Sequence, residues 1–268
     1  MHQTTVDIIR HARAGGGAAP GMGGPMPPYG HPGGAGMAAM APRPLPPSLL
    51  LLPLYAMSLQ KSLVLRGGGD VRVDERSYYQ IAFFNSDLQV SKLFTYPRMF
   101  SLHDMGGDVG LPLGEAGEGD EAEADGLLTA GRRRVRLPNL LNLSYERLSS
   151  AGIFLLENGF DLYMWLGRLV NPALLSTLFS LPSLEGVDMG AVSLRGENSD
   201  LSSRVVAVIE ALREERPSQY LQLHYIREGE GWGESYFARF LVEDRANFSG
   251  GGLSYTEYHA HVNRAVGV

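Results

Sequence analysis

Few side chains in this sequence have the types and spacing that catalysis or metal binding requires. His259 and His261 stand two residues apart, and side chains at that spacing on a helix do not face each other, so they are poorly placed to share a metal ion. The sequence contains no phosphate-binding glycine loop and no nucleophile elbow. It therefore predicts no catalytic residue and no metal site.

The most charged cluster inside an expected helix consists of Glu243, Asp244 and Arg245. Its carboxylates could perform acid–base chemistry. The simpler interpretation is a helix face on which Asp244 and Arg245 bond to neighbouring backbone or side-chain groups. A second acidic group, spread over residues 115–125, lacks the ligand spacing of an EF-hand calcium loop, so we interpret it as a solvated loop.

Two sets of residues are candidates for binding a partner. Trp232 lies in the glycine-rich segment 228–233, between an expected strand and an expected helix, where a large aromatic side chain can anchor a peptide. Tyr236 and Arg239 are weaker candidates on the adjoining helix. The alternative, that Trp232 folds back onto its own domain, stays open. Four arginines that follow the acidic segment could contact anionic lipid: Arg132, Arg133, Arg134 and Arg136.

The composition narrows the class of protein. The 268 residues carry a net charge of -6, which argues against a nucleic-acid binder, because that function needs a basic excess. With no cysteine, the chain has no disulfide and no sulfur-ligated zinc site. The longest apolar run, residues 49–54, is far shorter than the roughly 20 residues of a membrane-spanning helix, and residues 1–13 lack the apolar stretch of a signal peptide.

Glycine divides the chain into segments. Of 34 glycines, ten lie between residues 15 and 36 and eight between residues 106 and 131. Such segments bury too little apolar surface to offset chain entropy, so we predict two disordered glycine-rich insertions, at 14–46 and 106–134. The remaining ranges are a partial helix at 1–13, an all-helical segment at 47–105 and a mixed α and β region at 135–268.

Periodicity and turn residues predict the elements within these ranges. Tyr78, Ile81 and Phe84 recur at helical spacing. Asn158 and Gly159 separate two β-rich runs, which is a strong hairpin signal when both turn residues take a positive φ. Further expected elements are helices at 172–181, 201–215 and 234–247, a strand at 220–226 and a last helix at 254–266. Ser254 and Glu257 form a capping box at the start of that last helix. Trp165 is expected in the core. We therefore predict an α+β fold, with an all-helical segment followed by a central mixed β-sheet flanked by helices.

Several segments, in order along the chain, resemble the cargo-adaptor subunit of the COPII vesicle coat, the Sec-twenty-four (Sec24) family. Residues 45–55 are similar to the family segment LP-x-SL-x-LLPLY, and residues 241–245 match its LVEDR segment. Further similar segments are residues 74–78, 96–97, 137–148, 152–159, 163–167 and 254–258. The resemblance implies a helical domain followed by a gelsolin-like domain.

The resemblance also implies a function: a non-catalytic subunit of the COPII coat that binds cargo and SNARE sorting signals in endoplasmic-reticulum-to-Golgi transport. The implied partners are the sister inner-coat subunit, the outer coat, the cytosolic tails of cargo and SNAREs and, indirectly, the small coat GTPase. The implied location is the cytoplasm, on COPII-coated vesicles and in peripheral contact with the cytosolic face of the endoplasmic reticulum membrane. The family's zinc-finger, trunk and β-barrel regions are missing here, so we expect no cofactor in this chain. We also expect a fragment, a truncated gene model or a degenerate paralogue.

Two other classes stay open at this point. One is a gelsolin-like module that binds calcium or actin, because a fold does not dictate its function. The other is an enzyme whose site has no recognisable motif.

Overall fold

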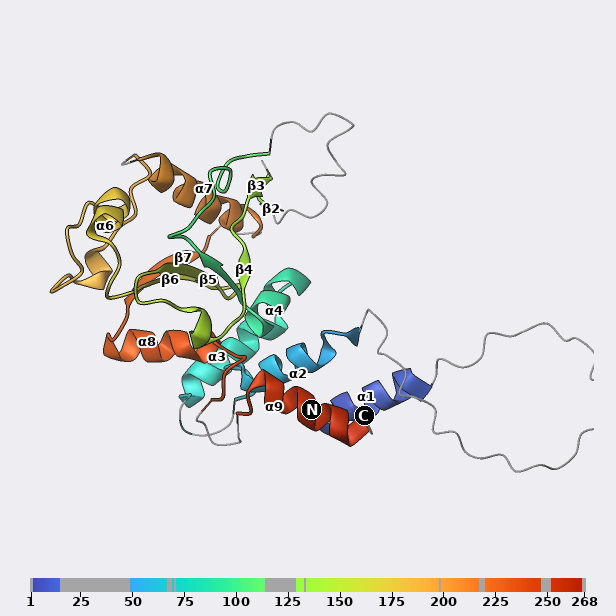
Figure 1. Ribbon diagram of the computed structural model, residues 1–268. Coiled ribbons are helices and arrows are strands. Elements are labelled where there is room, and N and C mark those ends of the chain that lie inside the picture. The colour runs from blue at the N-terminus through green and yellow to red at the C-terminus, as the bar shows by residue number, and fades with distance from the viewer. Residues whose placement is uncertain are drawn as a thin grey trace, which may run out of the picture.

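The computed structural model describes residues 2–14, 49–66, 69, 71–113, 129–132, 134–197, 199–216, 220–246 and 252–266 (Figure 1). The two predicted insertions fall largely on residues 15–48 and 114–128, which lie outside the described residues. In the described part, helices come first and a mixed sheet with flanking helices follows. The predicted α+β fold is confirmed.

Three helices from distant parts of the chain pack together at one end of the molecule. They are α1 (His2–Ala14), α2 (Leu52–Lys61) and α9 (Tyr255–Val266), and Figure 1 shows α9 beside α1 and α2. The predicted capping box at the start of α9 is confirmed, because the Glu257 N–H donates to Ser254 Oγ (3.3 Å) and the Ser254 N–H donates to Glu257 Oε2 (2.9 Å). The shared apolar core consists of Ile9, Met57, Tyr258 and Val262.

The helices α3 (Val73–Phe84) and α4 (Leu88–Thr95) follow as predicted. Tyr79 is the buried aromatic residue of α3 and lies between this helix and α4. The residues whose spacing predicted the helix lie on another side of it and are largely exposed, by 62%, 66% and 76% respectively: Tyr78, Ile81 and Phe84. The periodicity therefore predicted the helix correctly without indicating its buried side.

A five-stranded mixed sheet, in the order β4-β1-β5-β6-β7, forms the centre of the rest of the chain. The pair β6 and β7 is parallel, and the other neighbours are antiparallel. The strands are β1 (Arg98–Ser101), β4 (Leu140–Leu141), β5 (Ile153–Glu157), β6 (Asp161–Leu166) and β7 (Gln222–Arg227). The strand β1 comes from the range 47–105, so the end of that predicted helical segment belongs to the sheet.

Both ends of the predicted insertion 106–134 are ordered, contrary to the prediction. A two-stranded sheet pairs β2 (Thr129–Ala130) with β3 (Val135–Arg136), and the Gly110 N–H donates to the Arg136 carbonyl (2.8 Å). Gly110 has a φ of 83°, and a Cβ there would lie 2.6 Å from the carbonyl oxygen of Arg204. This glycine permits close packing, so the count of glycines wrongly placed residues 106–113, 129–132 and 134 in an insertion.

The turn between β5 and β6 differs from the predicted two-residue turn. Gly159 has a positive φ of 90°, but Asn158 does not. The Asn158 side chain instead accepts hydrogen bonds from the backbone N–H groups of Phe160 (2.9 Å) and Asp161 (2.8 Å). The hairpin is therefore correct, but a three-residue loop closes it, because the asparagine side chain satisfies the backbone itself.

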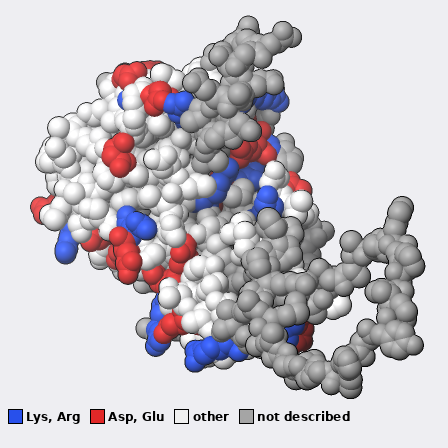
Figure 2. Space-filling model, turned by 45° about the vertical axis from the view of Figure 1, so that its right-hand side comes forward, with Lys and Arg blue, Asp and Glu red and all other residues white. Residues whose placement is uncertain are grey.

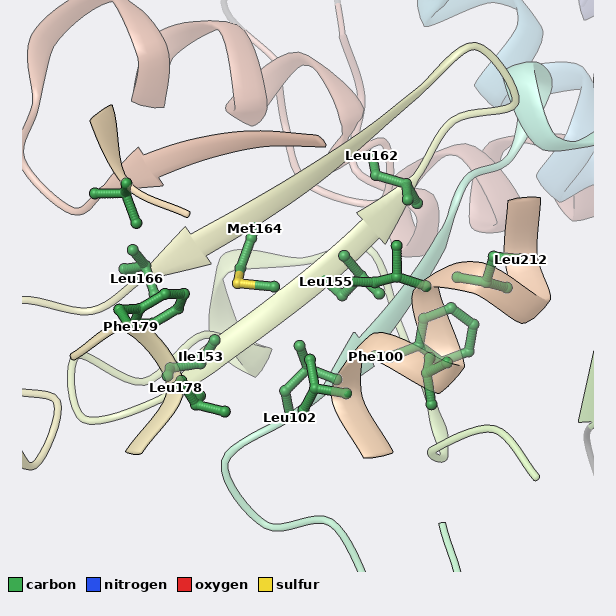
Figure 3. Packing of buried hydrophobic residues seen from close by; sticks show 14 of the residues in the cluster. Phe100, Leu102, Ile153, Leu155, Leu162, Met164, Leu166, Leu178, Phe179 and Leu212 are labelled. Atoms are coloured by element: carbon green, nitrogen blue, oxygen red, sulfur yellow. The ribbon is translucent and has the colours of Figure 1, made fainter. Parts of the chain in front are cut away.

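One face of the sheet packs against α6 (Pro172–Phe179) and α7 (Asp200–Glu214), both at the predicted places. Figure 3 shows this core, in which apolar side chains from the sheet meet Leu178, Phe179 and Leu212 from the helices. The side chains that β6 contributes to this core alternate along the strand, because successive residues point to opposite faces of the sheet: Leu162, Met164 and Leu166.

The opposite face of the sheet is covered by α8 (Gly231–Phe237) and the 3-10 turn η4 (Ala238–Phe240), on the same side as α3 (Figure 1). Phe237 and Phe240 pack there against Tyr163 and Trp165 of β6. Trp165 is only 2% exposed, which confirms its predicted place in the core. Two further 3-10 turns, η2 (Tyr145–Arg147) and η3 (Met189–Ala191), lie in the connections.

The predicted helix at 234–247 ends early, at Phe237, and continues only as η4. The following residues form short local turns and also bond to distant parts of the chain. The Glu243 N–H donates to the Leu143 carbonyl (3.1 Å), and Lys61 Nζ donates to the carbonyl oxygens of Val242 and Asp244 (both 2.7 Å). These tertiary bonds use backbone groups that a longer helix would have needed.

Candidate functional site

The three residues predicted to bind a partner lie together on α8 and the turn that follows it. The rings of Trp232 and Tyr236, one helical turn apart, stack with centroids 5.3 Å apart and planes 27° apart. The guanidinium carbon of Arg239 lies 5.1 Å from the centre of the Tyr236 ring. Stacking and cation–π attraction therefore hold the three side chains as one set.

Exposure separates Trp232 from the other two residues. Trp232 is 77% exposed, whereas Tyr236 and Arg239 are partly buried. The indole therefore does not fold back into the core, although one of its faces rests on Tyr236. Most of the Trp232 surface is available to a partner, and binding itself stays a prediction.

Tyr236 and Arg239 join α8 to the helical segment. The hydroxyl oxygens of Tyr236 and Tyr79 lie 2.5 Å apart, and Arg239 Nη1 donates to Glu75 Oε1 (3.1 Å), so both contacts reach α3. Burial raises the pKa of the Tyr236 phenol, which keeps it protonated at neutral pH. These two side chains position Trp232 on a rigid base.

The backbone conformation of the loop before α8 requires glycine at two positions. Gly229 and Gly231 have φ values of 78° and 40°, a region that favours glycine. The Gly229 N–H donates to Glu234 Oε2 (2.9 Å), which ties the loop to the first turn of the helix. The loop thus presents Trp232 from a defined backbone conformation.

Only some of the four arginines predicted to contact lipid are seen to be exposed and without an ion pair to a described residue. Arg132 and Arg134 are exposed near the β2–β3 turn, while Arg133 lies outside the described residues. Arg136 forms an ion pair with Asp108. On the face shown in Figure 2, blue and red side chains lie close together over the described part of the chain. Contact with a membrane stays a prediction for Arg132 and Arg134.

A groove of about 560 Å³ was not predicted from the sequence. It opens where α2 and α4 meet β4, the edge strand of the sheet, and its volume is in the range of ligand sites. Tyr55, Leu93 and Leu141 contribute apolar surface, and Lys92 is an exposed cation at its side. These residues come from separate segments and form no motif, so no local signal could have indicated the groove.

Two arginines and two glutamates form an ion-pair network in the groove wall. Arg98 donates to the buried Glu157 (2.9 and 2.6 Å) and to Glu215 (2.6 Å), and Arg216 also pairs with Glu157. Burial opposes the charge of Arg98, but Glu157 and Glu215 outweigh it and raise its pKa. Because the network is balanced in charge, its role in the wall is structural.

The residues considered for catalysis or metal binding are not brought together. His259 and His261 are both exposed on α9. The Asp244 carboxylate accepts hydrogen bonds from Ser144 Oγ (2.6 Å) and the Tyr145 N–H (2.8 Å), and Arg245 pairs with Glu257. These bonds agree with the predicted role of Asp244 and Arg245, but the cluster follows η4 and does not lie on a helix face. The described ranges contain no group of three acidic or histidine side chains suited to a metal ion, and none of their helices has the length and apolar character needed to cross a bilayer.

Two family models match the two parts of the chain. Residues 35–92 match the Sec23/Sec24 helical domain, and residues 134–202 match the gelsolin repeat. The second match covers the strands β5 and β6 and the helix α6. The fold is thereby defined as a helical segment joined to a gelsolin-like domain, as predicted.

Similar proteins match most of this chain. The human protein transport protein Sec24C is 31% identical over 83% of this chain, and SEC24 B of Arabidopsis thaliana is 30% identical over 83% of it. The crystal structure of the human COPII-coat protein Sec24c superposes with a TM-score of 0.66 at 30% identity, covering 83% of this chain and 26% of that one. The chain is related to the Sec24 family through its helical and gelsolin-like regions, and it spans 18% of the length of either curated relative.

Proposed function

We propose that this chain contributes to a COPII vesicle coat and acts by binding, without catalysis, in endoplasmic-reticulum-to-Golgi transport. The observation that supports the proposal most is the match, over 83% of the chain, to relatives that are named protein transport proteins. The similar structure is that of a COPII-coat protein. The chain needs no cofactor of its own for this role.

Within this role, Trp232 is the contact for short sorting peptides from the cytosolic tails of cargo and SNAREs. Its 77% exposure, its rigid base on Tyr236 and its position after a glycine loop support this assignment. An exposed indole can contribute a large apolar area to a peptide contact. Each contact would be weak, and many coat subunits on one vesicle would multiply it by avidity.

The proposed setting is the cytosolic face of the endoplasmic reticulum membrane and the coated vesicle. There the chain would meet the sister inner-coat subunit and the outer coat, and through them the small coat GTPase. Arg132 and Arg134 could add peripheral contact with anionic lipid, at about 1 kcal/mol for each residue near the surface. No nucleic acid partner is part of the proposal.

The test is a peptide-binding titration with the full chain. Fluorescence anisotropy of labelled SNARE-tail peptides should show saturable binding, and Trp232→Ala should weaken it at least tenfold. Tyr220→Ala removes another aromatic residue that is 66% exposed, and it should leave affinity unchanged. Equal affinity of the wild type and a folded Trp232→Ala variant would refute the site.

The alternative of a calcium- or actin-binding gelsolin module is not favoured. The gelsolin repeat matches residues 134–202, whereas the transport proteins match over 83% of the chain. A rise in the melting temperature of the chain with calcium, or its co-pelleting with actin filaments, would favour this alternative.

A further inference from the structure

A small cavity lies where the helical segment meets the gelsolin-like domain, away from the groove at β4. Its volume is about 180 Å³, and it is bordered by the end of α2, by η4 and by the turn after η4. Four of its lining residues are basic and one is acidic: Lys61, Arg66, Arg239, Arg245 and Asp244. The cavity wall thus carries a surplus of positive charge.

Two of these cations have a carboxylate partner among the described residues, whereas Lys61 does not. Arg239 and Arg245 form ion pairs with Glu75 and Glu257, which lie outside the lining. Lys61 forms no ion pair with a described residue, since it donates two hydrogen bonds to the neutral carbonyl oxygens of Val242 and Asp244. An ammonium group has three donors, so one remains.

The burial of the Lys61 ammonium group is energetically unfavourable. It is 4% exposed, and Arg66, which also lines the cavity, is 8% exposed. Burial lowers the pKa of Lys61 to about 8, the nearby Arg66 lowers it further, and Asp244, Glu257 and Glu243 only partly oppose these effects. No described carboxylate forms an ion pair with Lys61, and a bound anion would supply that counter-charge directly.

We propose that this cavity binds an oxyanion of the phosphate class, held by Lys61 and the surrounding arginines. The source is either free phosphate or the phosphoryl group of a phosphorylated partner side chain, and both present the same tetrahedral oxygens to charge-assisted donors. The anion would brace the contact between α2 and the turn after η4, and so the joint between the two parts of the chain. This inference does not depend on peptide binding at Trp232, although Arg239 belongs to both the cavity lining and the Trp232 set.

The primary test is the melting temperature of the full chain in inorganic phosphate, at constant ionic strength kept by sodium chloride. The melting temperature should rise with phosphate concentration, because a ligand of the native state stabilises it. Lys61→Met should weaken phosphate binding at least tenfold. Lys92→Met, a matched change at an exposed lysine of the groove, should leave it unchanged. No rise beyond that in sodium chloride alone would overturn the proposal.

A second readout distinguishes anion binding from general stabilisation. A bound anion raises the pKa of Lys61, so sulfate binding at pH 8.5 should take up protons, measurable by calorimetry in buffers of different ionisation enthalpy. Binding without proton uptake would place the anion elsewhere and overturn the assignment. If Lys61→Met fails to fold, Arg245→Gln replaces it, because that side chain is 67% exposed and lies in the same lining.

A phosphoserine peptide with blocked ends separates the two sources. Tighter binding of this peptide than of free phosphate identifies a phosphorylated partner as the source. Equal or weaker binding identifies the free ion. Competition between the two probes is expected in both cases, and absence of competition would contradict a shared site.

Discussion

The burial of Lys61 predicts that the wild type gains stability relative to a Lys61→Met variant as the pH rises. Replacing it by methionine removes the ammonium group and its two hydrogen bonds to Val242 and Asp244. In the wild type, burial lowers the Lys61 pKa from 10.5 to about 8. At about 1.4 kcal/mol per pH unit, that difference corresponds to at most about 3–4 kcal/mol of unfavourable free energy in the folded state.

The direction of the effect follows from proton binding. Below pH 8 the lysine is charged in both states, and the fold carries the whole penalty. Between pH 8 and 10.5 the folded chain has released a proton that the unfolded chain still binds, so the stability of the wild type rises relative to the variant. Above pH 10.5 both states are neutral and the difference stays level.

The assay is urea unfolding of wild type and Lys61→Met in phosphate-free buffers between pH 7 and 11. Subtracting the two free energies of unfolding cancels the tyrosines, which titrate in both proteins. Their difference should increase by up to about 3–4 kcal/mol in favour of the wild type across the stated window. Lys92→Met should show no such increase. A difference that is flat or falls with pH would refute the reasoning.

Three further predictions concern stability, each measured as the free energy of urea unfolding. Phe237→Ala empties a fully buried position between α8 and the sheet and should cost about 3–5 kcal/mol, and a loss below 1 kcal/mol would contradict the packing of that face. Glu157→Gln leaves the buried Arg216 without its counter-charge and should cost about 3–5 kcal/mol. An unchanged free energy of unfolding would show that the network is not formed. Ser254→Ala removes the capping box of α9 and should cost about 1 kcal/mol, whereas an unchanged stability would show that the cap is not formed.

Elements with strong local signals could be predicted from the sequence. The capping box of Ser254 and Glu257 and the asparagine–glycine turn indicated α9 and the β5–β6 hairpin, because caps and turns depend on neighbouring residues. Trp232 was chosen as a candidate for the same reason, since its glycine loop is a local feature, and its binding role stays a prediction. The order of family-like segments then indicated the fold that the comparisons confirm.

Features made by distant residues could not be predicted. Lys61 bonds to the carbonyl of Val242, which lies 181 residues away, and this contact helps to explain why the helix after Trp232 ends early. The range 106–134 was predicted as disordered from its glycines, yet Gly110 is there because α7 passes within contact distance. The groove beside β4 and the basic cavity at Lys61 also combine remote segments, so no periodicity or motif could indicate them.

Site-specific photocrosslinking at position 232, in a coat assembled on vesicles that carry cargo and SNAREs, tests the central claim most directly. A photoreactive amino acid in place of Trp232 should crosslink to the cytosolic tails of these proteins, and the same group at Tyr220 should not. Crosslinks of equal yield at both positions, or none at position 232 in an assembled coat, would contradict a peptide-binding role for this chain.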